Sequence, residues 1–176
     1  MACLQKFSGD RSWGCDSRAQ GGTLGKYNEA VLINASDIES FSGDGIATLV
    51  LASGKKGSVV EVINNSVKVS VARKGGDMFP VMYDPSVIIK VPSSYFSKYN
   101  GAAHDFVNSS FVIALSGSNG YTIIGLGAPL VCTEIEGDST ASEFLTVTYG
   151  TDEGQTGSTI YGLAKATYEA LKVPAA

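Results

Sequence analysis

The sequence is poor in charged side chains and in the residues that carry most enzyme chemistry. Asp, Glu, Lys and Arg make up 17% of its 176 residues, whereas an average soluble domain has about 25%. His104 is the only histidine, so a serine or cysteine triad would have to be built on it. The neighbouring carboxylate, Asp105, is adjacent in sequence and therefore poorly placed to face that histidine. We expect that the protein is not an enzyme and has no catalytic residue.

Motifs for metals and cofactors are also missing. Cys3, Cys15 and Cys132 are odd in number, lie far apart and lack the spacing of metal ligands, so the sequence indicates neither a disulfide framework nor a zinc site. The glycine-rich stretches at residues 21–27 and 125–130 lack the spacing of a phosphate-binding or dinucleotide-binding loop. The sequence therefore predicts no cofactor-binding residue and no metal site.

Long apolar runs are absent, and the charge is unevenly distributed. No segment approaches the roughly 18 apolar residues of a spanning helix, and the N-terminus has no apolar signal core, so we expect a cytosolic origin and no membrane partner. The net charge of −4 argues against a tight electrostatic grip on nucleic acid. Residues 91–176 hold 3 Lys/Arg and 8 Asp/Glu, so the acids gather late in the chain.

Glycine and short apolar runs are what the sequence has in abundance. Its 21 glycines and 5 prolines are typical of a turn-rich β protein. The strongest signal lies at residues 105–127, where the apolar runs 111–115 and 121–126 flank the turn Ser-Gly-Ser-Asn-Gly. This pattern predicts a β-hairpin, around which the rest of the chain is organised. Because neither arm alternates cleanly, we expect both faces to be buried, one in a core and the other against an adjoining subunit.

Further elements follow from the same reasoning. We predict strands at residues 29–35, 46–52, 58–73, 78–91, 129–136, 142–149 and 158–163. A capping-box spacing predicts a helical turn at residues 36–39, and short helices are expected between residues 92 and 103 and at 164–171. The fold class is mainly β, an antiparallel sandwich or barrel with a short flanking α-helix. It forms one domain over residues 28–176, preceded by an N-terminal arm at residues 1–27.

Four residues are candidates for contacts between subunits. Phe7 and Trp13 are large apolar side chains in the glycine-rich arm, and we expect the arm to dock on its own domain or on a neighbour. Lys55 and Lys56 form a basic turn, for which simple solvation is the alternative. The long strands 58–73 and 78–91 would favour pairing with another copy if their edges were exposed.

The order and spacing of these elements resemble phage tail tube proteins and tail-tube-like ring proteins, particularly those of viruses that infect gut Bacteroidales. The stretches that carry the resemblance are VLINASDIESF, ATLVLASGKKGSVVEVINNSVKVSVA, YDPSVIIKV through SFVIALSGSNGYTIIGLG, and APLVCTEIEGDSTASEFLTVTYGTDEG. They cover roughly residues 29–162, which is most of the chain. The polar head of 27 residues has no clear counterpart in that family.

The resemblance implies a structural virion protein of the tail or neck, made in the host bacterial cytoplasm. Copies would assemble side by side into a ring, a hexamer or a dodecamer, whose sheets join around a channel. The implied partners are other copies, neighbouring tail, portal or ring proteins, and genomic DNA that passes without specific binding. An acidic lining would repel the phosphates, which makes Glu134, Glu136 and Asp138 the candidate channel-lining residues.

Other interpretations remain open. A solvated acidic strand, half of a glycosidase pair and a calcium site are alternatives for the three carboxylates. A capsid decoration or fibre-base protein is the main alternative for the chain. A carbohydrate-binding β-sandwich ranks below it, because a single tryptophan in an arm is a poor platform for sugar stacking.

Overall fold

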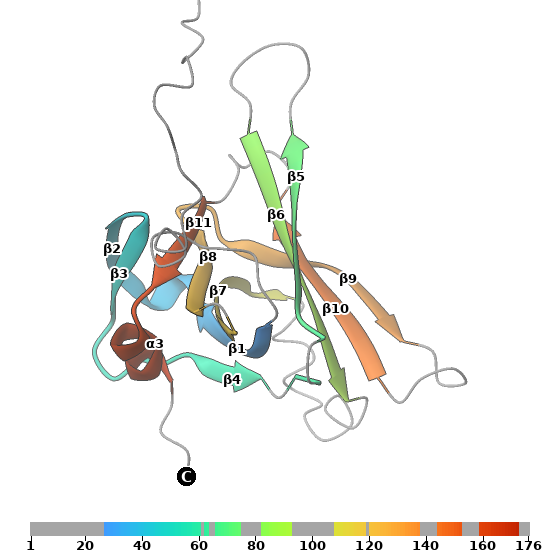
Figure 1. Ribbon diagram of the computed structural model, residues 1–176, viewed down its shortest axis with the longest axis horizontal. Helices are drawn as coiled ribbons and strands as arrows, with labels where there is room; N and C mark the ends of the chain where they lie inside the picture. Colours follow the sequence, from blue (N-terminus) through green and yellow to red (C-terminus); the bar gives the residue numbers. More distant parts are fainter. Residues whose placement is uncertain are drawn as a thin grey trace, which may run out of the picture.

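The computed structural model describes residues 27–60, 62–63, 66–74, 82–92, 108–118, 120–137, 144–152 and 159–172. Within these ranges the chain is mostly β, a single curled, open sheet that forms a half-barrel, with one short α-helix (Figure 1). The strands are β1 (Tyr27–Asn34), β2 (Ile38–Asp44), β3 (Ile46–Leu51), β4 (Ser58–Val60), β5 (Lys68–Lys74), β6 (Met82–Pro92), β7 (Ser110–Gly117), β8 (Gly120–Leu126), β9 (Leu130–Gly137), β10 (Phe144–Thr151) and β11 (Thr159–Leu163). The helical elements are the 3-10 turn η2 (Ala35–Asp37) and the helix α3 (Lys165–Leu171). The expected mainly-β fold with a short flanking helix is confirmed.

The predicted hairpin is the centre of this sheet. β7 and β8 pair in antiparallel register, with Gly117 opposite Gly120 at the turn. β7 also pairs with β1 along its length and with the first residues of β9. Its ladders with β1 and β8 use the same residues, so β1 lies along one edge of β7, and β8 lies along the other. From this junction the sheet continues to β11, β3 and β2 on one branch and to β10, β6 and β5 on the other.

Two glycines make the corner at which these branches separate. Gly125 has φ +102° and Gly127 has φ +83°, a backbone conformation that other residues rarely adopt. The pairing of β8 with β11 shifts register at Gly125, as expected for a β-bulge. A Cβ at this position would lie 3.0 Å from the carbonyl oxygen of Phe111. Glycine therefore lets β8 bend against β7 and release the chain into β9.

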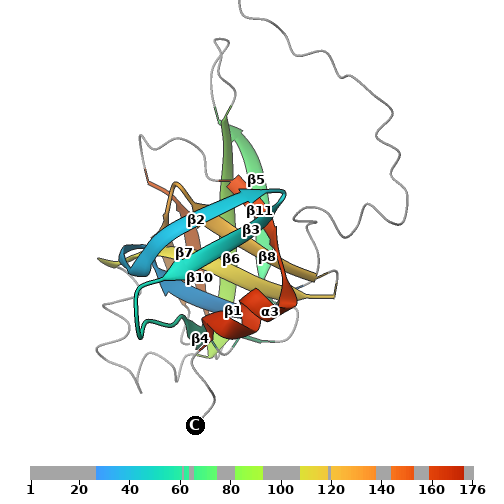
Figure 2. The ribbon, with the colours of Figure 1, turned by 90° about the vertical axis from the view of Figure 1, so that its left-hand side faces the viewer.

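Side chains of the central hairpin alternate between two cores. The first core contains Phe111, Ile113 and Leu115 from β7, packed against β6 and β10. The second contains Val112 and Ala114 from the opposite face of β7, packed against β3 and α3. Figure 2 shows β2, β3 and α3 together on that second side.

The expectation that an adjoining subunit covers the second face is therefore wrong. The chain covers this face itself, because Tyr168 and Leu171, three residues apart on α3, form an apolar stripe that needs an apolar surface. Ala47 of β3 and Leu163 of β11 complete the cover.

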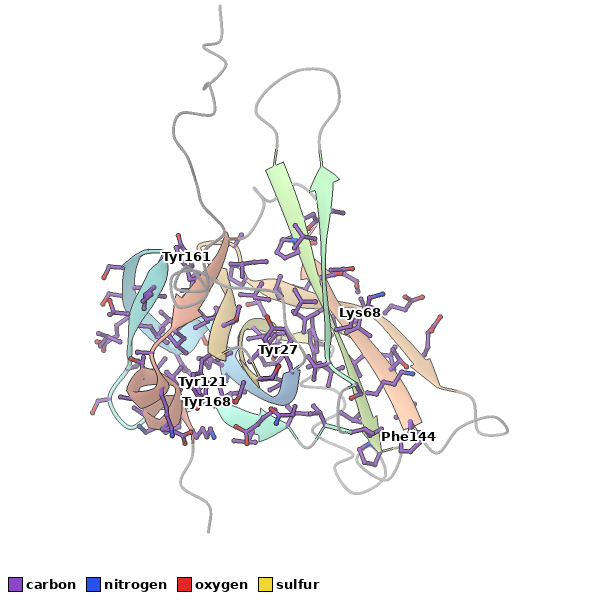
Figure 3. All side chains as sticks on the ribbon, in the orientation of Figure 1. Tyr27, Lys68, Tyr121, Phe144, Tyr161 and Tyr168 are labelled. Atoms are coloured by element: carbon purple, nitrogen blue, oxygen red, sulfur yellow. The ribbon has the colours of Figure 1, made fainter. Side chains whose placement is uncertain are left out.

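A polar cluster holds α3 in place. The Tyr168 hydroxyl donates a hydrogen bond to Glu29 Oε1 at 2.7 Å, and Lys172 Nζ lies 2.6 Å from the same oxygen. The Tyr168 ring stacks beside Tyr121 at 4.8 Å between centroids (Figure 3). The backbone N–H of Gly57 donates to the Leu171 carbonyl oxygen at 2.7 Å. A helix of 7 residues is too short to be stable alone, so these contacts and the second core stabilise it.

Two local expectations need correction. Residues 58–73 do not form one strand, because β4 pairs with β1 whereas β5 pairs with β6, and a turn near Ile63 separates the two ladders. The helical turn expected at residues 36–39 is present as the 3-10 turn η2 (Ala35–Asp37), but its N-cap is Asn34, and Glu39 lies in β2. The expected helix between residues 92 and 103 lies outside the described residues.

We predict that Gly125→Ala lowers the free energy of unfolding by about 2–3 kcal/mol, because it combines a positive φ with a close contact to Phe111. Gly54→Ala is the matched control. Gly54 has φ +76° but nothing within 4 Å of the added Cβ, so we expect a loss of about 1 kcal/mol. Urea unfolding of both variants measures the difference, and equal losses would contradict the role of the corner.

We also predict a pH dependence of α3 docking. Burial raises the pKa of Glu29, but hydrogen bonds from Lys172 and Tyr168 outweigh it and hold the pKa below the ordinary value of 4.5. A carboxyl group whose pKa is lowered by folding stabilises the protein at pH values above its ordinary pKa. This stabilisation is lost as the pH falls through the folded-state pKa. Glu29→Gln should lower stability at neutral pH and reduce the loss on acidification, measured by urea unfolding at several pH values. An unchanged acid loss in this variant would contradict the assignment to Glu29.

Candidate assembly surfaces

The strands β9, β10, β6 and β5 are consecutive neighbours that form one branch of the sheet, which we call the wing. All of its neighbouring pairs are antiparallel. Figure 1 shows the wing along one side of the molecule, with β5 and β6 reaching beyond the other strands. One face of the wing packs on the first core through Val87, Ile89, Val147 and Tyr149, among others. The other described elements, β1 to β4, β7, β8, β11 and α3, which we call the body, therefore cover this apolar face.

The opposite face of the wing is polar, as strand alternation requires. Two rows of cross-strand partners run over this face. The first row is Glu136, Thr146 and Lys90. The second row is Glu134, Thr148, Ile88 and Lys68. The four charged side chains among them are exposed, and Lys68 is labelled on the wing in Figure 3. The carboxylates lie on β9, and the lysines lie on β6 and β5, at the other side of the wing.

Both edges of the wing are open over the described part of the chain. β9 meets β7 only at Leu130 and Val131, and residues 132–137 pair with β10 alone. β5 pairs with β6 alone over residues 68–74. Each edge presents backbone N–H and C=O groups that can pair with another strand. The wing is therefore a sheet that can be extended at both ends.

The structure places some of the predicted residues and not others. Glu134 and Glu136 lie on the same exposed face, because residues two apart on a strand point to the same side, and both stand next to the β9 edge. Asp138, Phe7, Trp13 and His104 lie outside the described residues. Lys68 alternates with the apolar Val67 and Val69 in the sequence, which is typical of a polar strand face, but no sequence signal places it across the wing from the carboxylates, because this depends on the strand order.

Lys55 and Lys56 lie in the turn between β3 and β4. Lys55 Nζ is 3.6 Å from Asp37 Oδ1, and its side chain is largely exposed. Lys56 Nζ donates to the carbonyl oxygen of Ala170, near the C-terminal end of α3, where a cation interacts favourably with the helix dipole. Within the chain, Lys56 thus contacts the helix, whereas Lys55 pairs with Asp37 and stays largely exposed.

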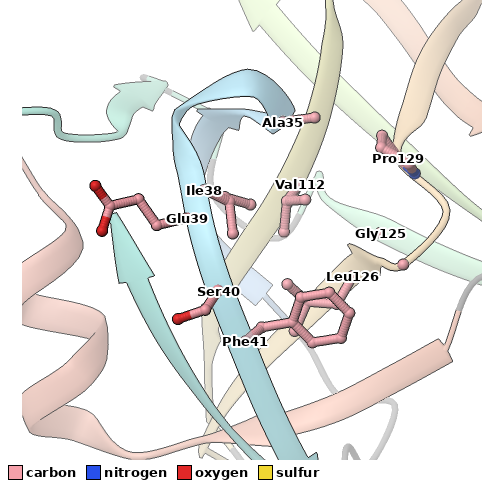
Figure 4. A pocket seen from close by; sticks show the side chains of 10 residues that line it. Ala35, Ile38, Glu39, Ser40, Phe41, Val112, Gly125, Leu126 and Pro129 are labelled. Carbon is pink, nitrogen blue, oxygen red and sulfur yellow. The ribbon is translucent and has the colours of Figure 1, made fainter. Parts of the chain in front are cut away.

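A separate surface feature is a groove of about 440 Å³ beside β2 (Figure 4). Its lining is mostly apolar and comprises Ala35, Ile38, Glu39, Ser40, Phe41, Val112, Gly125, Leu126, Gly127 and Pro129. Among these lining residues, Glu39 has the only ionisable side chain and Ser40 the only hydroxyl, so the groove holds no acid–base pair.

The described residues offer little for catalysis or metal binding. No group of three or more His, Cys, Asp or Glu side chains gathers among them to hold a metal ion. Cys132 is half-buried, and burial raises the pKa of its thiol above 9.0, which disfavours the reactive thiolate. No helix in the described ranges is long and apolar enough to cross a membrane.

Comparison with known proteins gives no relative: no family model, no curated protein and no solved structure matches the chain.

Proposed function

We propose that this protein is a structural virion protein of a bacteriophage, whose copies assemble into rings in the tail tube or the neck and tail channel. The observation that carries the proposal is the wing, an antiparallel sheet with two open edges of opposite charge. The resemblance of most of the chain to tail-tube-like ring proteins supports the same assignment. The ring would be a hexamer or a dodecamer.

Strand direction supports a closed assembly. Because the wing has an even number of antiparallel strands, β9 and β5 run in opposite directions. If the ring axis runs along the strands, neighbouring copies are related by a rotation about this axis, and this rotation leaves the direction of every strand unchanged. The β9 edge of one copy therefore meets the β5 edge of the next in an antiparallel arrangement, and the sheet continues without interruption.

Charge favours the same pairing over its alternatives. The β9 edge carries Glu134 and Glu136, whereas Lys68 stands at the β5 edge with Lys90 on the adjoining β6. Pairing two β9 edges would bring carboxylates together, and pairing two β5 edges would bring lysines together. Pairing β9 with β5 joins opposite charges. Such head-to-tail contacts generate rings when the rotation closes.

The wing also supports a channel. Because the body covers the apolar face, a ring of joined wings would have the body outside and the polar face inside. Glu134 and Glu136 would then line the channel, together with Thr146, Thr148, Lys68 and Lys90. With as many carboxylates as lysines among these residues, this part of the lining has no net positive charge that would hold the phosphates of passing DNA.

The first test is the mass and the negative-stain appearance of the purified protein over a range of concentrations. We expect rings or short tubes with a central hole, in amounts that rise with concentration. A protein that stays monomeric at every concentration would contradict the proposal and favour the capsid-decoration alternative.

The second test reverses the charge of each edge. Glu134→Lys combined with Glu136→Lys makes both edges basic, and Lys68→Glu combined with Lys90→Glu replaces both lysines of the other edge with carboxylates, so we expect each variant to need about tenfold more protein to assemble. An equimolar mixture should assemble as the wild type does, because each basic edge then meets an acidic one. Sedimentation velocity measures all three samples. Wild-type assembly by both variants alone would contradict the pairing of β9 with β5 but leave the ring itself in place.

A further inference from the structure

The groove beside β2 has the surface of a binding site for an aromatic side chain. Phe41 is 45% exposed at its rim, and an added Cβ on Gly127 would lie 3.6 Å from the Phe41 ring. Val112 and Leu126, which belong to the second core, are also in its lining. Covering this surface with a large aromatic side chain would bury about 150–250 Å² of that side chain.

The strand that borders the groove is also open. Over the described residues, β2 pairs with β3 alone, so its outer edge has free backbone groups. An extended segment can add to such an edge, with backbone hydrogen bonds giving affinity and alternate side chains entering adjacent pockets. The groove and the β2 edge therefore suit an extended peptide that carries an aromatic residue.

The chain contains a segment with these properties. Residues 1–26 include Phe7 and Trp13, and they hold four Lys/Arg and two Asp, so the segment is net basic. The rest of the protein is acidic, and Glu39 is the one charged side chain among the described residues that line the groove. The charges of the segment and of the groove are complementary.

The distance is also compatible. Trp13 precedes Tyr27 by 14 residues, which span up to about 46 Å when extended. β1, with 8 residues, separates Tyr27 from the beginning of η2 at the groove by about 26 Å. A tethered segment that can reach a groove has a high effective concentration there, so it outcompetes the same segment of another copy.

We infer that the N-terminal segment of the same chain binds in this groove, with the indole of Trp13 against Phe41 and the adjoining backbone along the edge of β2. This docking does not depend on ring formation. It gives the groove an occupant and gives the only tryptophan of the chain a defined contact surface.

Trp13 itself reports on the test, because every tryptophan signal of the protein comes from it. We expect blue-shifted emission and an acrylamide quenching constant several-fold lower than that of the protein in urea. Phe41→Glu should raise the quenching constant several-fold toward the unfolded value. Val50→Glu is the matched control: Val50 is 53% exposed on the opposite face of the β2–β3 hairpin, and its variant should quench as the wild type does.

Three results would overturn the inference. A wild-type quenching constant equal to that in urea would show that Trp13 is exposed. Equal constants for Phe41→Glu and the wild type would place Trp13 elsewhere. A constant that falls as protein concentration rises would assign the groove to the segment of a second copy. Urea unfolding establishes that each variant is folded, and Glu39→Lys, an exposed rim change, provides a second groove variant that should also raise the constant.

Discussion

The whole structure depends on the burial of β7 on both faces. Its apolar residues alternate between two cores, so neither side of the strand can be left in water. β6 and β10 cover one side, and β3, β11 and α3 cover the other. Burial of an apolar side chain contributes roughly 1.5–3 kcal/mol, so the free energy gained on both sides of one strand organises most of the remaining chain. This constraint also explains why a helix of 7 residues is needed at the end of the chain.

Covering both faces of β7 forces the sheet to divide. A flat sheet cannot wrap around one of its own strands, so the chain bends at Gly125 and Gly127 and sends β9 away from β8. The wing that results has its apolar face on the first core and its polar face outward, and its strands extend past the ends of their neighbours in the body. Two edges that are open over the described residues follow from this division, and the proposed assembly rests on them.

Local sequence signals predicted several elements well. The turn between residues 116 and 120, the alternation in residues 67–72 and the terminal helix all have local causes, namely glycine in the turn, period-2 apolar residues and an i, i+3 apolar pair. Prediction failed where partners decide the outcome. Residues 58–73 have continuous strand propensity, yet they divide between two ladders. The capping box at Ser36 was overridden because Ile38 to Asp44 pair with β3.

The sequence by itself determined that this protein is mainly β, that it turns often, that its central hairpin is buried on both faces and that Glu134 and Glu136 share a strand face. These properties depend on neighbours within a few residues of one another. Only the tertiary structure decided that α3 covers the second face of β7, that Lys68 and Lys90 share a surface with the carboxylates, and that the edges of β9 and β5 are open over the described residues. The reason is that strand order arises from contacts between segments far apart in the chain, and side-chain periodicity carries no information about which strand lies next to which.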